Sequence, residues 1–124
     1  ALRPRLVQKR MFDRLRGTEF ENYVAPPDPG SMHSFGMALD LTLRLRSGES
    51  LDMGTDFDDF HELAQPKYEE HFRAQGLLSE ASLQNRLLLR RLMHEQGFEV
   101  LPHEWWHFNA RPSREVMGRY PLLK

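Results

Sequence analysis

Two short segments that lie far apart in this chain restrict its fold more than any other feature. Residues 31–40 (SMHSFGMALD) contain a histidine and an aspartate, and residues 104–107 (EWWH) contain a glutamate and a second histidine. A metal site requires its ligands to converge on one point. A fold that uses these residues together must therefore bring the two segments side by side.

The four polar residues in these segments suit metal-assisted hydrolysis. His33 and His107 offer nitrogen ligands and Asp40 offers an oxygen ligand, a set that leaves the fourth position of a catalytic zinc ion open. Such an ion lowers the pKa of its bound water to about 7. Glu104, three residues before His107, could take the proton of that water as a general base. We therefore expect one zinc ion per chain.

The residues around these motifs predict where each side chain lies. Leucines alternate with other residues between Met37 and Leu45, which predicts a strand, and Ser47-Gly48 followed by Glu49–Met53 predicts a hairpin. Side chains seven apart face opposite sides of an ideal strand. His33 should therefore precede the strand, with Gly36 as the bend. Glu104 and His107, three apart, should need a bulge or a bend at a strand end.

Two helices and two further strands complete the predicted architecture. The helices are Pro4 to about Arg16, with an apolar stripe at Leu6, Val7, Met11 and Leu15, and Ser79 to Gln96, with a core stripe at Leu83, Leu87, Leu88 and Leu92. The strands are Phe98–Leu101 and Trp105–Asn109, and Tyr120 and Leu122 should anchor the tail. We expect one α+β domain over residues 1–124, with an antiparallel sheet that carries the zinc site between flanking helices.

Composition excludes several classes of function. The net charge of −1 gives no electrostatic case for binding nucleic acid or an anionic membrane. No apolar run approaches the length of about 20 residues that a membrane span needs. The absence of cysteine excludes disulfides and thiolate metal sites, and it leaves a cytoplasmic and a periplasmic location both open.

The motifs together resemble the zinc D-alanyl-D-alanine dipeptidases of the vancomycin-resistance type. The resemblance rests on Ser31-x-His33-x-x-Gly36-x-Ala38-x-Asp40, on Glu104-x-Trp106-His107, on Met53-Gly54-x-x-Phe57-Asp58 and on Arg3-Pro4. Wider relatives are the D,D-carboxypeptidases and the hedgehog signalling domain. The resemblance covers essentially the whole chain and implies hydrolysis of the D-alanyl-D-alanine dipeptide in bacterial cell-wall metabolism.

The resemblance also implies roles for three residues outside the zinc set. Arg3 would stabilise the oxyanion of the tetrahedral intermediate, and Ser31 and Asp58 would engage the ammonium end of the substrate. Each residue has a simpler interpretation: Arg3 as a solvated charge, Ser31 as a turn residue and Asp58 as part of an acidic loop. The alternative functions are a D,D-carboxypeptidase acting on peptidoglycan stem peptides and a non-catalytic zinc-bearing binding domain.

The start of the chain departs from the family pattern. Several tens of residues that precede the arginine-proline step in relatives have no counterpart before Arg3. We expect an N-terminal segment, attached or associated, to pack against the first helix. Because chain ends are poorly ordered unless they are tied down, that segment should also hold Arg3 in place.

Overall fold

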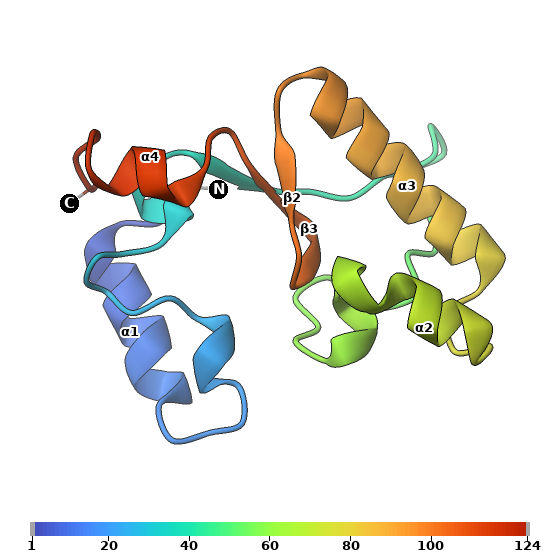
Figure 1. Cartoon of the computed structure of the whole chain (residues 1–124), viewed down its shortest axis with the longest axis horizontal. Coiled ribbons are helices and arrows are strands. Elements are labelled where there is room, and N and C mark those ends of the chain that lie inside the picture. Colours follow the sequence, from blue (N-terminus) through green and yellow to red (C-terminus); the bar gives the residue numbers. More distant parts are fainter. Residues whose placement is uncertain (1, 124) are drawn as a thin grey trace. The chain divides into compact units, whose positions relative to one another are not determined.

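The computed structural model describes residues 2–123 and divides the chain into two compact units. One unit contains the chain up to Leu39 and from Asn109 onward, and the other contains Asp40–Phe108. Figure 1 labels the helices and strands, which are α1 (Arg5–Leu15), β1 (Ala38–Asp40), α2 (Glu69–Ala74), α3 (Glu80–Glu95), β2 (Glu99–Leu101), β3 (Glu104–Asn109) and α4 (Ser113–Met117). The predicted α+β class is confirmed. None of the helices described is long and apolar enough to cross a membrane.

The three strands form one antiparallel sheet in which β3 lies between β1 and β2. The amide of Leu41 donates to the carbonyl of Trp106 at 3.0 Å, and the amide of Ala110 donates to the carbonyl of Met37 at 2.8 Å. These two bonds fix the register of β1 on β3. Pro102 and His103 form the turn that joins β2 to β3, so the two strands predicted near the C-terminus are confirmed.

The strand predicted from Met37 to Leu45 is shorter than expected. Only Ala38–Asp40 is regular strand, because the chain changes its hydrogen-bonding partner after Leu41. The carbonyl of Leu43 accepts from the amide of Leu51 at 3.1 Å, and Arg44 and Ser50 form an isolated antiparallel bridge. The hairpin therefore exists as a few backbone pairs rather than as two full strands.

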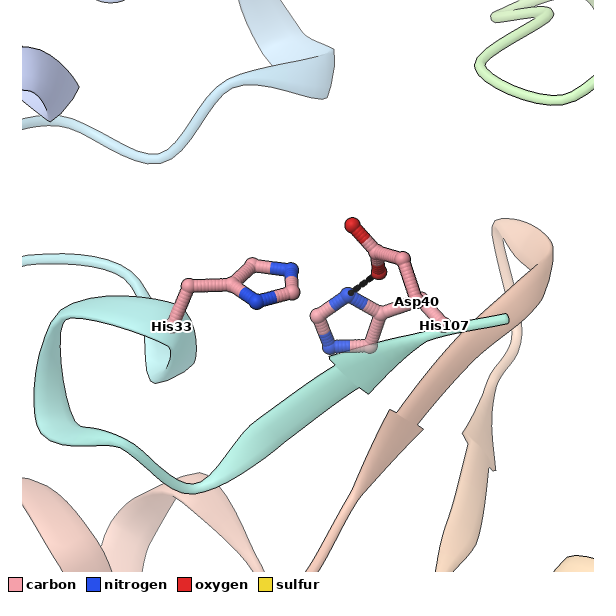
Figure 2. Close-up of side chains that lie close together, drawn as sticks. All are labelled: His33, Asp40 and His107. Carbon is pink, nitrogen blue, oxygen red and sulfur yellow. Dashed lines mark ion pairs between the residues drawn. The ribbon is translucent and has the colours of Figure 1, made fainter. Parts of the chain in front are cut away.

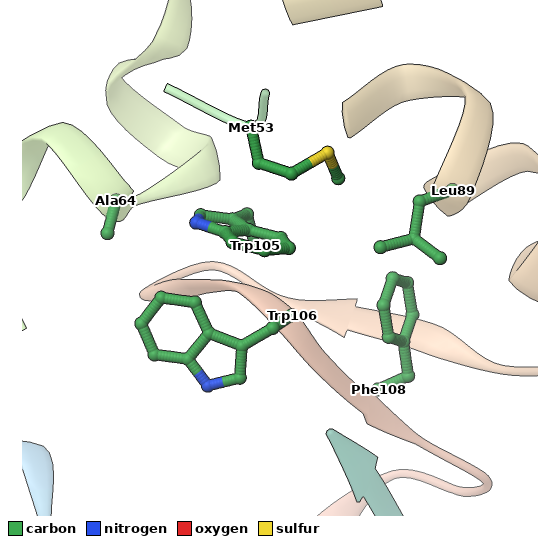
Figure 3. Packing of buried hydrophobic residues seen from close by; sticks show 6 residues of the cluster. All are labelled: Met53, Ala64, Leu89, Trp105, Trp106 and Phe108. Atoms are coloured by element: carbon green, nitrogen blue, oxygen red, sulfur yellow. The ribbon is translucent and has the colours of Figure 1, made fainter. Parts of the chain in front are cut away.

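The core of the Asp40–Phe108 unit is built on the aromatic residues of β3. Its buried members are Met53, Ala64, Leu89, Trp105, Trp106 and Phe108. Figure 3 shows Met53 and Leu89 directed toward the rings of Trp105 and Phe108. Helix α3 begins as predicted, with the Ser79 hydroxyl accepting from the amide of Ser82 at 3.1 Å. Its leucine stripe was only partly right, since Leu87 and Leu92 are exposed.

A buried arginine occupies the centre of the inner face of α3. The side chain of Arg86 is 0% exposed and donates to the carbonyls of Met53 at 2.6 Å and Leu63 at 3.0 Å. Glu69 of α2 lies 3.5 Å from Arg86 and accepts a 2.7 Å hydrogen bond from Arg90. Burial lowers the pKa of Arg86, and the charge of Glu69 opposes that effect. This network fixes both ends of the 53–63 loop to the helices.

The other unit has a smaller apolar cluster formed by Met32, Phe35, Ala38 and Val116. Tyr120 and Leu122 pack against it, which confirms them as anchors of the tail. The stripe predicted on α1 was wrong in its first turn, because Leu6 and Val7 are exposed and the buried residue is Gln8. A polar residue faces inward there because it makes two hydrogen bonds, to Arg3 and to Ala25.

Candidate metal centre

The register of the sheet places Asp40 directly opposite His107. Since Leu41 pairs with Trp106 and Met37 with Ala110, the pairing between these bonds sets Asp40 against His107. Directly opposed residues project from the same face of an antiparallel pair, with side chains in contact. Asp40 Oδ1 accordingly lies 3.2 Å from His107 Nδ1. Both side chains are largely buried, at 15% and 8% exposure.

His33 lies in an irregular segment before β1, as predicted. It belongs to the 3₁₀ turn Met32–Phe35, where its amide donates to the Ser31 hydroxyl at 3.3 Å. Gly36 ends the turn with a φ of 71°, a conformation that glycine adopts without steric cost. Its amide donates to the carbonyl of His33 at 3.2 Å. Gly36 is therefore the bend that the spacing of His33 and Asp40 required.

These three residues could hold a metal ion. One ligand atom from each of His33, Asp40 and His107 lies within 4.8 Å of the other two. Figure 2 shows the His33 ring directed toward the His107 ring and the Asp40 carboxylate. Ligand atoms at 2.0–2.2 Å from a tetrahedral zinc ion lie about 3.4 Å from one another. The 3.2 Å separation of Asp40 and His107 is close to that value, and the nitrogen–nitrogen–oxygen donor set suits zinc.

Glu104 approaches the three candidate ligands from the end of a strand. It is the first residue of β3, directly after the Pro102–His103 turn, and its Oε2 lies 3.7 Å from His107 Nδ1. An ideal strand would direct the two side chains to opposite faces, so a bulge or a bend at the strand end stays the prediction that would account for this approach. Glu104 is not among the three residues with closely grouped ligand atoms. It therefore has the position of a neighbour of the centre.

Arg3 is tied to the turn that carries His33. Its backbone amide donates to the His33 carbonyl at 3.1 Å, and its guanidinium donates to Gln8 Oε1 at 3.0 Å. This use of Gln8 was not predictable, because a glutamine on a mostly polar helix has no distinguishing pattern. Ser31 is 8% exposed and caps the turn through His33. Its position fits the simpler interpretation as a turn residue, and a substrate role remains a prediction.

Asp58 lies in an exposed turn of the loop that Arg86 fixes. Its φ of 62° is unusual for a residue with a side chain. The preceding residue, Phe57, packs its ring against Trp105 and Trp106 at centroid distances of 6.2 and 5.7 Å. The packing of Phe57 on β3 and the hydrogen bonds of Arg86 to the ends of the loop together hold the turn that contains Asp58.

Comparison with known proteins identifies similar sequences. Residues 8–121 match the sequence profile of a peptidase family described as D-ala-D-ala dipeptidase. The chain is 36% identical over 123 residues to the D-alanyl-D-alanine dipeptidase of Escherichia coli, covering 99% of this chain and 56% of that protein. It is 38% identical over 109 residues to the protein of that name from Enterococcus faecium, covering 86% and 49%. The chain thus spans about half the length of these curated relatives.

Proposed function

The chain belongs to the D-ala-D-ala dipeptidase family, and we propose that the protein carrying it is a zinc metallopeptidase that hydrolyses the D-alanyl-D-alanine dipeptide in bacterial cell-wall metabolism. The observation that carries this proposal is the grouping of His33, Asp40 and His107, with Glu104 beside them. Family membership supports the substrate, and the donor set supports the metal.

The three ligands of the proposed zinc ion come from two kinds of local structure. His33 approaches from a rigid 3₁₀ turn, and Asp40 and His107 approach from paired strands. When bound, zinc supplies Lewis acidity and a water of lowered pKa. Burial of His33 and His107, at 3% and 6% exposure, limits competition from solvent for these positions. The fold thus supplies a preorganised and largely dry set of donors.

Glu104 acts as the general base and then as the general acid in this proposal. A carboxylate can accept a proton from water and return it to the leaving amine. The distance of 3.7 Å between Glu104 Oε2 and His107 Nδ1 supports this role. Arg3 stabilises the oxyanion, since its guanidinium is always protonated and rich in donors. Asp58 and Ser31 recognise the ammonium end of the dipeptide.

Substitution of Glu104 tests the catalytic part of the proposal. Glu104→Ala should reduce kcat by about 10²–10⁴-fold while bound zinc stays near one per chain. Glu99→Ala, an exposed carboxylate on the adjacent strand, is the control and should keep wild-type turnover. His33→Ala should instead lose zinc. Loss of zinc from Glu104→Ala would make it a ligand, and unchanged turnover would remove it from the mechanism.

The choice of substrate tests the dipeptidase part. D-Alanyl-D-alanine, its N-acetylated form and a stem pentapeptide should be compared by kcat/KM. A charge-assisted hydrogen bond that the substrate ammonium donates to Asp58 is worth about 1.5–3 kcal/mol, so acetylation should lower kcat/KM roughly tenfold to a hundredfold. Asp58→Ala should narrow this difference. Equal rates on free and acetylated substrates would favour a D,D-carboxypeptidase, and no turnover in a zinc-loaded protein would favour a binding domain.

A further inference from the structure

We infer that Gln8 is a positioning residue for the proposed reaction, holding the guanidinium of Arg3 toward the substrate without neutralising its charge. This inference rests on the proposed function, because it concerns the oxyanion role of Arg3. Gln8 lies in the first turns of α1 and is 0% exposed, although the residues on either side of it, Val7 and Lys9, are exposed. A fully buried amide requires a specific set of partners.

The partners of Gln8 connect two segments to the helix. Its Oε1 accepts from the Arg3 guanidinium at 3.0 Å, and its Nε2 donates to the Ala25 carbonyl at 2.6 Å. The bond to Ala25 fixes the plane of the amide, and the fixed plane determines where Oε1 receives the arginine. Gln8 therefore acts as a rigid acceptor rather than as a mobile side chain.

Arg3 is held at both ends as a result. Its backbone amide donates to the carbonyl of His33, and its side chain is held by Gln8. A free arginine side chain has about 2 kcal/mol of rotamer entropy to lose on ordering. Bonds within the described chain remove much of that freedom before substrate binds. These bonds order Arg3 whether or not an N-terminal segment also packs against the helix, and that segment stays a prediction.

The choice of glutamine over glutamate has a chemical reason. A carboxylate at this position would form an ion pair with Arg3 and would compete with the oxyanion for the guanidinium. A neutral amide accepts from one N–H group of the Arg3 guanidinium. It leaves the positive charge and the remaining N–H donors of that guanidinium for the substrate. Gln8→Glu should keep an acceptor for Arg3 but lose the hydrogen bond that Nε2 donates to Ala25, and it should impair turnover. A purely structural role for Gln8 would lower turnover to the same extent whether or not Arg3 is present.

The experiment measures four proteins loaded with zinc: wild type, Gln8→Ala, Gln8→Glu and Lys9→Ala. Each is also made in an Arg3→Ala background. Kinetics with D-alanyl-D-alanine give kcat and KM, and calorimetry gives the Kd of a phosphinate analogue, whose tetrahedral phosphorus bears two oxygens that share the negative charge. Thermal unfolding reports stability. Lys9→Ala, an exposed neighbour on the same helix, is the matched control.

Both Gln8 variants should lower kcat by about tenfold to a hundredfold, with a smaller change in KM, and should weaken phosphinate binding by a similar factor. In the Arg3→Ala background neither should lower kcat further, because there is no guanidinium left to position. Equal loss in both backgrounds, or full turnover by Gln8→Glu, would overturn the inference. If Gln8→Ala does not fold, Gln8→Met keeps the volume and takes its place.

The same data separate this inference from the proposed function. An active wild type that needs Arg3 but not Gln8 overturns only the inference. A zinc-loaded wild type that does not hydrolyse the dipeptide, or that is unaffected by Arg3→Ala, overturns the inference together with the corresponding part of the proposed function.

Discussion

The turn that carries His33 and the strand that carries His107 are held by different forces. In the turn, the fixed groups are backbone amides and carbonyls, with Ser31 as the cap and Gly36 as the left-handed end. In β3, the residues on both sides of His107 are fully buried aromatics, Trp106 and Phe108. A turn built on backbone bonds can position a ligand with little apolar burial. A strand built on large side chains also supplies much of the stability of its unit.

Trp106→Ala should have the largest effect on stability. The indole is 0% exposed in the aromatic core, and such a truncation costs about 3–5 kcal/mol of the free energy of unfolding. Urea unfolding monitored by circular dichroism would measure it. Leu92→Ala, at a 42% exposed position on α3, is the control and should cost less than about 1 kcal/mol. Similar losses of unfolding free energy in both variants would break the comparison, since they would show that the stability of β3 does not depend on its buried side chains.

Glu69→Gln should have the next largest effect. Removing the carboxylate leaves Arg86 and Arg90 without their buried counter-charge, and a hydrogen bond to a charged group is worth about 1.5–3 kcal/mol. The urea midpoint should fall accordingly. Glu70→Gln, the exposed neighbour paired with Arg73, should change the free energy of unfolding by less than about 1 kcal/mol. Equal midpoints would show that the network behind β3 adds nothing.

Gly36→Ala should act mainly on the metal centre. A side chain in the left-handed region costs about 1–2 kcal/mol, and relaxing that strain would shift the turn that carries His33. Zinc affinity, measured by competition with a chelator, should fall. Gly48→Ala has the same kind of strain at φ 92° in an exposed hairpin turn. Gly48→Ala should lose stability and keep its zinc affinity. If both variants lose zinc affinity to the same extent, the loss in Gly36→Ala does not come from a shift of the turn that carries His33.

His103→Asn should have the smallest effect, visible only as a pH dependence. Partial burial, and then the charge of Lys67, lower the pKa of His103 below its usual value of about 6.5. The unfolded chain therefore binds this proton more readily, so stability is lost as pH falls from about 6.5 through the folded pKa. The variant should lose less stability than wild type between pH 7 and pH 5. Identical pH profiles would exclude His103 as a contributor.

The sequence predicted the residues of the candidate metal centre better than the packing contacts that hold them in place. The spacing of His33, Gly36 and Asp40 required a bend before a strand, and the structure has that bend. The capped helix α3 and the two strands near the C-terminus were also predictable, because caps and alternation are local signals. The outward direction of Leu6 and Leu87 was not predictable in this way. An apolar residue signals burial only where another surface is available to cover it.

The sequence by itself determined which donors this chain has, their order and the local turns that present His33. Tertiary structure decided the register that sets Asp40 opposite His107 and the approach of Glu104. It also decided the burial of Gln8 and Arg86. These features depend on contacts between residues distant in the chain. The identity of a single polar side chain does not show which distant residue it will contact. A buried polar group is recognisable only when the fold shows which donors and acceptors surround it.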